Sequence, residues 1–211
     1  MGFITAIFVT FLLLCFSEII WRRKTMHNEL ARKLVHISVG TFVAFWPFFL
    51  SWNNIRFLSL AFVAVVITSQ YLQIFTAIHS VERPTWGEVL FALSVGLVTY
   101  ITNDPYIYAA AILQMSIADG LAAVVGIRYG QTNRYRILGQ YKSLMGSLAF
   151  LAASITILAW YVLASGTTIN AGYVALLALG ATLVENIGVR GFDNLLAPLL
   201  VAFVLTKLTH L

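Results

Sequence analysis

Long apolar segments dominate this chain and leave it few ways to fold. About eight of them follow one another along the 211 residues, and several approach the roughly 20 residues that an α-helix needs to cross a bilayer. They cover residues 3–21, 34–52, 55–78, 88–102, 105–127, 144–164, 171–187 and 195–210. Because 60% of the residues are hydrophobic and only 10% are charged, we predict an all-α fold, a polytopic bundle of transmembrane helices.

The number of spans depends on one short break. The fourth segment is short, and only Asn103, Asp104 and Pro105 separate it from the fifth. This break is either a tight turn between two spans or a kink within one, so we expect eight spans, with seven as the alternative. No internal repeat or low-complexity linker divides the sequence. We therefore predict a single integral membrane domain over residues 1–211.

The basic residues are distributed unequally between alternate loops. Of the 13 Lys and Arg residues, all except Arg56 and Lys207 fall in one set of loops. Cytoplasmic loops carry the excess of Lys and Arg, so this set is predicted to be cytoplasmic and both termini non-cytoplasmic. Basic loops beside a membrane also account for the net charge of +5, and no nucleic-acid partner is expected.

Four polar clusters interrupt the apolar segments, and the charge count places all of them at or near the cytoplasmic face. Ionisable groups at membrane depth are costly, so each cluster is a candidate functional site. The clusters are Glu29 to His36, Arg83 to Glu88, Asp119–Gly120 with Lys142–Ser143, and Glu185 to Asn194. Their shared location predicts one site that faces the cytoplasm.

The first cluster has the spacing of a helix face. Glu29, Arg32 or Lys33, and His36 follow one another at intervals of three or four residues, so a helix presents them together. Arg32 and Lys33 alone are equally well explained as snorkelling anchors at the cytoplasmic boundary, and His36 as a helix cap. His36, about a turn inside the boundary, favours a functional role.

The second cluster has a structural alternative for its acidic residue. Thr85 and Glu88 have the spacing of a capping box, which would explain both residues at the start of the fourth segment. A capping box does not explain Arg83 so close to Glu88. Both Arg83 and Glu88 are therefore candidate site residues.

Asp119 is the strongest single candidate. It precedes Arg128 by nine residues, which places it roughly 13 Å below the loop at 1.5 Å per helical residue. A carboxylate at that depth needs a cation, a polar partner or water. The small residues that follow it are explained by close helix packing. We expect Gly120 to break the helix and open Asp119 to a cytoplasmic cavity.

The sixth apolar segment begins with residues suited to an anion. Lys142, Ser143, Gly146 and Ser147 combine a cation, hydroxyls and a glycine at a helix N-terminus, where free N–H groups and the helix dipole receive phosphate. The motif is not a Walker A loop. Alternatively, the basic loop from Arg128 to Lys142 binds anionic headgroups.

The fourth cluster adds carboxylates and an amide. Asp193 or Asn194 would cap a helix, but Glu185 at the membrane edge has no such explanation. Several carboxylates that meet several cations at one face are typical of a site for a divalent metal and a polyphosphate.

In this order, the motifs resemble those of the dolichol kinase/phytol kinase group, a polyprenol kinase family that also includes CTP-dependent diacylglycerol kinases. The resemblance extends from about residue 29 to residue 198, and one position departs from it, since Met145 stands where the family often has Glu. The matching runs are Arg32–Lys33–Leu34–Val35–His36, Arg83-x-x-x-Gly87–Glu88, Ala118–Asp119–Gly120 with Ala123, Gly126 and Tyr129–Gly130, Lys142–Ser143-x-x-Gly146–Ser147, and Glu185 followed by Asp193–Asn194.

The resemblance implies a multi-pass lipid kinase with its active site facing the cytoplasm. Such an enzyme transfers the γ-phosphate of a nucleotide, typically CTP, to the hydroxyl of phytol, geranylgeraniol, another polyprenol or diacylglycerol. Phosphoryl transfer requires mostly positioning and charge neutralisation. The roles expected are Mg²⁺ binding by Asp119, Glu185 and Asp193, catalysis by Asp119, Glu88, Lys142 and His36, and nucleotide binding by Arg32, Lys33, Arg83, Arg128, Lys142, Ser143, Gly146, Ser147 and Asn194.

Two other functions remain as alternatives. A CDP-lipid synthase uses the same nucleotide in a similar membrane setting, but the sequence lacks the second Lys–Asp and Asp–Arg–x–Asp run expected near the C-terminal end. A transporter would use Asp119 and Glu185 as proton or cation sites near the midplane. The missing inverted repeat and the clustering at one face argue against a transporter.

Overall fold

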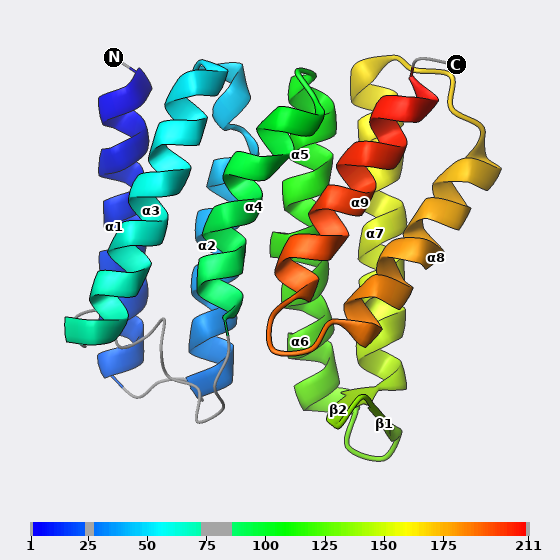
Figure 1. Cartoon of the computed structure of the whole chain (residues 1–211). Coiled ribbons are helices and arrows are strands. Elements are labelled where there is room, and N and C mark those ends of the chain that lie inside the picture. The colour runs from blue at the N-terminus through cyan, green and yellow to red at the C-terminus, as the bar shows by residue number, and fades with distance from the viewer. Residues whose placement is uncertain (1, 24–27, 73–85, 210–211) are drawn as a thin grey trace.

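In the computed structural model the chain is almost entirely helical (Figure 1). The structure describes residues 2–23, 28–72 and 86–209. The α-helices are α1 (Gly2–Arg22), α2 (Asn28–Ala44), α3 (Trp52–Leu72), α4 (Gly87–Ile101), α5 (Pro105–Leu113), α6 (Asp119–Tyr129), α7 (Leu144–Ser165), α8 (Ala171–Ile187) and α9 (Asp193–Leu208). Each predicted apolar segment overlaps one helix, except that the fifth is the continuous run of α5, the π-helix η2 (Gln114–Ala118) and α6. Residues 73–78 of the third segment and residue 210 of the eighth lie outside the described residues. The predicted helical character is confirmed.

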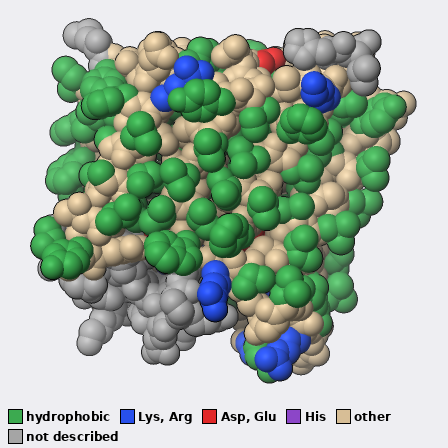
Figure 2. Space-filling model, in the orientation of Figure 1, with side chains coloured by type: hydrophobic (Ala, Val, Ile, Leu, Met, Phe, Trp, Pro, Cys, Tyr) green, Lys and Arg blue, Asp and Glu red, His purple; other side chains and the backbone are tan. Residues whose placement is uncertain are grey.

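Four of the described helical segments are long and apolar enough to cross a membrane. They are Gly2–Ile20, Trp52–Leu72, Pro105–Tyr129 and Leu144–Ser165, while Gly87–Ile101 and Ala171–Ile187 are shorter apolar helices. Hydrophobic side chains cover most of the face seen in Figure 2, and its Lys and Arg side chains gather near the two ends. These apolar helices fit a membrane protein, and the count of eight spans stays a prediction.

The second predicted segment differs most from its helix. It was expected over residues 34–52, but α2 begins at Asn28 and ends at Ala44. Pro47 lies in the short 3-10 helix η1 (Trp46–Phe48) that follows, where its ring and missing N–H prevent a regular α-helix from continuing. The early start of α2 places Arg32, Lys33 and His36 on its first half.

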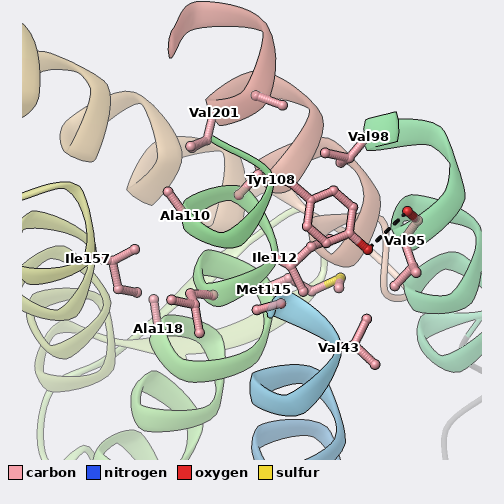
Figure 3. Close-up of a cluster of buried hydrophobic side chains, with 14 of the residues drawn as sticks. Val43, Val95, Val98, Tyr108, Ala110, Ile112, Met115, Ala118, Ile157 and Val201 are labelled. Carbon is pink, nitrogen blue, oxygen red and sulfur yellow. Dashed lines mark hydrogen bonds between the residues drawn. The ribbon is translucent and has the colours of Figure 1, made fainter. Parts of the chain in front are cut away.

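The run from α5 to α6 is the central helix of the bundle. In this segment 61% of the residues in its most apolar window are buried, against 22% to 28% in the other three candidate spans. It packs against α2, α4, α7 and α9. Figure 3 shows this core, in which Tyr108 donates a hydrogen bond of 3.3 Å to the carbonyl of Val95 and Ile157 and Val201 approach from α7 and α9.

A π-helical turn lies just before Asp119. The N–H of Asp119 donates to the carbonyl of Gln114, five residues earlier, which is the bond that defines η2. The expected helix break at Gly120 is wrong, because Gly120 lies buried within α6. A Cβ on Gly120 would lie 2.3 Å from Cγ1 of Ile37, so this glycine lets α2 pack closely against α6.

A β-hairpin forms in the segment that we expected to be a basic loop. Strands β1 (Arg134–Ile137) and β2 (Gln140–Ser143) pair antiparallel, joined by Leu138 and Gly139 with φ angles of 47° and 83°. These angles suit the two-residue turn that matches the twist of paired strands. The hairpin lies at the end of the bundle opposite the start of α1 and the end of α9 (Figure 1).

Candidate functional site

Three carboxylates from distant parts of the chain meet at the hairpin end of the bundle. Asp119 begins α6, Glu185 lies in the last turn of α8, and Asp193 begins α9. Each offers a carboxylate oxygen, and these three atoms lie within 4.8 Å of one another. Asp119 and Glu185 are only 6% and 4% exposed. The structure therefore brings together the three residues predicted to bind a metal.

A tight loop between α8 and α9 places Asp193. Arg190 and Gly191 have positive φ angles of 55° and 92°, so the chain reverses within a few residues. Gly188 passes so close to Asp193 that a Cβ on this glycine would lie 2.5 Å from the Cβ of Asp193. The N–H of Trp86 donates to the carbonyl of Arg190 at 3.0 Å, which ties the loop to the start of α4.

Two lysines neutralise two of the carboxylates. Lys33 of α2 donates to Oδ2 of Asp119, and Lys142 of β2 donates to Oε1 of Glu185 and, at 3.0 Å, to its backbone carbonyl. Burial by itself lowers the pKa of Lys142, but the charges of Glu185 and Asp193 outweigh this effect and raise the pKa above its usual value. Lys142 therefore stays charged at physiological pH.

His36 and Asn194 connect three helices beside the carboxylates. Nε2 of His36 lies 3.1 Å from Oδ1 of Asn194 and 3.8 Å from Oδ2 of Asp119. Nδ2 of Asn194 donates to the carbonyl of Gly87 at 3.0 Å. The N-cap of α9 is Phe192, which forms no side-chain capping bond. Asn194 therefore joins α2, α4 and α9 instead of capping its own helix.

Glu88 lies in a separate ion pair. It is 8% exposed, and its Oε1 lies 3.8 Å from Nη1 of Arg32. The N-cap of α4 is Trp86, without a side-chain capping bond, whereas the predicted capping box has Thr85 as its N-cap. Thr85 itself lies outside the described residues. The carboxylate of Glu88 therefore forms an ion pair with Arg32 of α2.

The start of α7 is built for close approach to α6. Ser143 is the N-cap, and its Oγ accepts a hydrogen bond of 3.1 Å from the N–H of Gly146. A Cβ on Gly146 would lie 2.9 Å from the carbonyl oxygen of Ala122, and one on Gly126 would lie 3.0 Å from Oγ of Ser143. The positive end of the α7 dipole is thus next to Lys142, a favourable setting for an anion.

A cavity of about 700 Å³ connects these groups. Its volume falls in the range of pockets that enclose small molecules. Its walls come from α2, α6, the hairpin, the start of α7 and the loop between α8 and α9. Most of the predicted site residues line it: Arg32, Lys33, Asp119, Lys142, Ser143, Gly146, Ser147, Glu185, Asp193 and Asn194.

Two of the carboxylate oxygens are available to bind a metal ion. Oε2 of Glu185 and Oδ1 of Asp193 are buried, and neither accepts a hydrogen bond from any residue that the structure describes. Buried polar atoms in proteins nearly always have a partner. Carboxylate oxygens are the ligands that Mg²⁺ prefers. The three residues therefore fit a divalent cation.

Of the predicted phosphate ligands that the structure describes, Arg128 is not brought to the cavity. Arg83 lies outside the described residues. Arg128 is exposed near the end of α6, where its guanidinium lies 5.6 Å from the centre of the Tyr129 ring, and it is not among the described residues that line the cavity.

Other residues of the cavity were not predicted from the sequence. Arg134, Gln140 and Tyr141 reach it from the hairpin, and Arg190 reaches it from the loop after α8. The alternation of polar and apolar residues on both sides of Leu138 was the one available signal for the hairpin. It was weak because the strands have only four residues each.

The comparisons with known proteins agree with the motifs. The chain is 30% identical over 194 residues to a phytol kinase of Synechocystis sp., covering 87% of this chain and 81% of that protein. It is 31% identical over 206 residues to a probable chloroplastic phytol kinase 2 of Glycine max, covering 87% and 68%. No protein-family model and no solved structure matches the chain. Identity at this level over most of both sequences shows that the protein belongs to the phytol kinase family.

Proposed function

We propose that this protein is a membrane-embedded lipid kinase that transfers the γ-phosphate of CTP to the hydroxyl of a lipid alcohol at the cytoplasmic face. The alcohol is phytol, geranylgeraniol, another polyprenol or diacylglycerol. The names of the relatives support a phytol-type substrate, since they are phytol kinases. The observation that carries the proposal is the meeting of three carboxylates and two lysines in one cavity.

The charges of this cavity suit phosphoryl transfer. Such a reaction needs little covalent chemistry from the protein, and its rate comes from positioning and from neutralising charge on the phosphates. Asp119, Glu185 and Asp193 would hold Mg²⁺, which would supply positive charge to neutralise the phosphates. Lys142 and the start of α7 would receive the nucleotide phosphates.

Asp119 and His36 are the proposed candidates for the group that accepts the proton of the lipid hydroxyl. Asp119 and His36 adjoin each other, with 3.8 Å between Oδ2 and Nε2. Neither Glu88 nor His36 is among the described residues that line the cavity, but His36 adjoins Asp119, whereas Glu88 is paired with Arg32. We therefore keep Asp119 and His36 as candidates and assign Glu88 to the positioning of Arg32.

The location of the cavity suits two very different substrates. It lies where the apolar helices meet a polar hairpin, at the end of the bundle opposite the start of α1. If this end faces the cytoplasm, as the basic loops predict, soluble nucleotide enters from water while a lipid hydroxyl approaches from the bilayer. A single site at the membrane boundary is therefore proposed to serve both.

Transfer of label from CTP to lipid tests this function. Purified protein in lipid vesicles would be given phytol, geranylgeraniol, diacylglycerol or phosphatidic acid with CTP labelled at either the γ- or the α-phosphate. We expect label in extractable lipid from γ-labelled CTP alone. Label from α-labelled CTP would instead indicate a CDP-lipid synthase. No label from either, together with cation-driven uptake of a solute, would indicate a transporter.

A further inference from the structure

The hydrogen bond between His36 and Asn194 determines what His36 can do in the reaction. We propose that His36 is a positioning residue, which through Asn194 fixes the start of α9 and with it the carboxylate of Asp193. This inference rests on the proposed function, because it assigns a role within that reaction. It goes further by deciding between the two candidate bases in favour of Asp119.

The bonds of Asn194 show where His36 carries a hydrogen atom. Nδ2 of Asn194 donates to the carbonyl oxygen of Gly87 at 3.0 Å. A backbone carbonyl can only accept, so the amide nitrogen of Asn194 faces Gly87 and the amide oxygen faces His36. The amide oxygen also only accepts, so Nε2 of His36, which lies 3.1 Å from it, carries a hydrogen atom and donates. This holds for the neutral and the charged imidazole alike.

The donor role of Nε2 prevents it from acting as a base. A ring nitrogen that carries hydrogen has no free lone pair for a second proton, and Nε2 is the atom of His36 that lies 3.8 Å from Oδ2 of Asp119. The imidazole is buried, with its centre 4.6 Å from that of the Phe91 ring, and His36 is not among the described residues that line the cavity. A general base must lie within hydrogen-bond reach of the proton that it takes. Of the two candidates, Asp119 lines the cavity and meets this requirement.

The start of α9 depends on Asn194 for its position. The N-cap of this helix, Phe192, forms no side-chain capping bond. Asn194, in the first turn, is instead held from two sides, by the carbonyl of Gly87 in α4 and by His36 in α2. Asp193 is the preceding residue of the chain, so a shift of Asn194 also moves the carboxylate of Asp193.

One face of α2 therefore positions two of the three carboxylates. Lys33 and His36 are three residues apart, which places them on the same face of the helix. Lys33 pairs with Asp119, and His36 bonds to the residue that follows Asp193. Groups that orient a metal ligand change metal affinity or activity by about 10- to 100-fold when they are replaced. We therefore expect the loss of the His36 bond to weaken the metal site.

Two amide substitutions distinguish a positioning role from a base, because each copies one nitrogen of histidine. The amide nitrogen of glutamine is as many bonds from Cα as Nε2 of histidine, and that of asparagine is as many as Nδ1. His36→Gln should therefore retain a donor for Asn194, whereas His36→Asn and His36→Ala should lose it. An amide does not accept a proton at neutral pH, so a base at position 36 would be lost in all three variants.

The first measurement is the binding of Mn²⁺, which shares the preference of Mg²⁺ for oxygen ligands. Electron paramagnetic resonance would follow it in purified protein in detergent, without nucleotide or lipid alcohol. We expect the Kd for Mn²⁺ to rise about tenfold or more in His36→Asn and His36→Ala, and to stay within about threefold of the parent in His36→Gln. Initial rates of γ-phosphate transfer from labelled CTP at a fixed Mg²⁺ concentration should follow the same order.

Ser38→Ala is the control on the same helix. The hydroxyl of Ser38 donates to the carbonyl of Leu34 within α2 at 2.8 Å, so its removal takes a side-chain hydrogen bond from the helix without touching α9. This variant should match the parent in Mn²⁺ binding and in transfer rate. Melting temperatures of all variants would be measured in detergent, and if His36→Ala does not fold, the contrast between His36→Gln and His36→Asn still decides.

The possible outcomes separate this inference from the proposed function. Equal Mn²⁺ affinities of His36→Gln and His36→Asn would overturn the positioning role, and so would a parent that binds no Mn²⁺. Equal loss of transfer in all three variants with unchanged Mn²⁺ binding would overturn it as well, and would make His36 the base. If Mn²⁺ binding follows the expected order but the parent transfers no γ-phosphate to lipid, the proposed function fails while the positioning role stands.

Discussion

Asp119 shows how a single buried charge is held in this protein. Its carboxylate is paired with Lys33 of α2 and lies 3.8 Å from His36, so two helices fix its position. Lys33 is only 5% exposed. The alternative in which Lys33 serves as a snorkelling anchor is therefore wrong, because its ammonium pairs inside the bundle.

We predict that Asp119→Asn abolishes transfer of phosphate to lipid. The amide has the same shape, so the protein should still insert and fold, but it replaces an anionic oxygen ligand with a neutral one. Initial rates with γ-labelled CTP measure the loss. Asp104→Asn makes the same change at the other end of the bundle, where Asn can still cap α5, and it should stay active. Normal activity of Asp119→Asn would refute the metal-ligand assignment.

Lys142→Ala should lower kcat by on the order of a hundredfold or more. Lys142 is charged at physiological pH, and losing one preorganised charge that stabilises the leaving diphosphate costs this much. The ion pair of Lys142 with Glu185 stabilises the folded protein fully at pH values below the usual pKa of lysine. This stabilisation is lost only when the pH rises through the higher pKa that Lys142 has in the folded protein. The control, Lys207→Ala in the last turn of α9, should match the parent. Equal rates for the two variants would contradict the phosphate-binding role of Lys142 and favour the alternative, in which the segment from Arg128 to Lys142 binds lipid headgroups.

The residue types of the site were predictable, but their pairing was not. Asp119, Glu185 and Asp193 stood out because charge in an apolar sequence is costly. Which lysine meets which carboxylate depends on how α2, α8 and the hairpin pack, and no local pattern encodes that packing. The same limit explains why Arg128 was expected at the phosphates although it lies away from the cavity.

At the scale of elements, the junction of α6 and α7 shapes the site. Gly146→Ala would place a Cβ 2.9 Å from the backbone oxygen of Ala122, which cannot rotate away. The start of α7 must then shift, at a cost of about 1–3 kcal/mol in the free energy of unfolding. We expect a lower melting temperature and a higher KM for the nucleotide, measured by thermal unfolding in detergent and by transfer rates.

The control for this change is another glycine within a helix. Gly180→Ala in α8 would place its Cβ 3.8 Å from Cδ2 of Leu200, an ordinary contact. Alanine favours a helix more than glycine does, so this variant should be as stable as the parent or slightly more stable. Equal melting temperatures and KM values for Gly146→Ala and the parent would show that the start of α7 can move away from α6 without loss of stability or nucleotide binding.

Helices were predictable as elements, whereas the hairpin and the π-helix were not. Apolar length alone located α7 and α8 to within a residue or so of their ends. The hairpin turn carries Leu138 at a position that usually holds Asn, Asp or Gly, so the common turn signal is absent. The π-helix η2 has no composition that distinguishes it from its flanking helices.

At the scale of the whole molecule, the charge distribution predicts an orientation. The start of α1 and the end of α9 lie at one end of the bundle and the cavity lies at the other (Figure 1). With Cys15 replaced by Ala, a cysteine at Asn53 should react with an impermeant maleimide from outside the cell. A cysteine at Gln131 should react only after the membrane is permeabilised, so that the maleimide reaches the cytoplasmic face. The opposite pattern would place the cavity outside the cytoplasm.

The central claim is that the three carboxylates hold the metal ion used in phosphate transfer. Asp193 tests it most directly, because its Oδ1 is buried and accepts no hydrogen bond from a described residue. The measurement is the rate of γ-phosphate transfer as Mg²⁺ is titrated after chelation, for the parent and for Asp193→Asn. We predict no transfer without a divalent ion and a half-maximal Mg²⁺ concentration at least about tenfold higher in the variant. Identical titrations, or a rate that is insensitive to chelation, would contradict the claim.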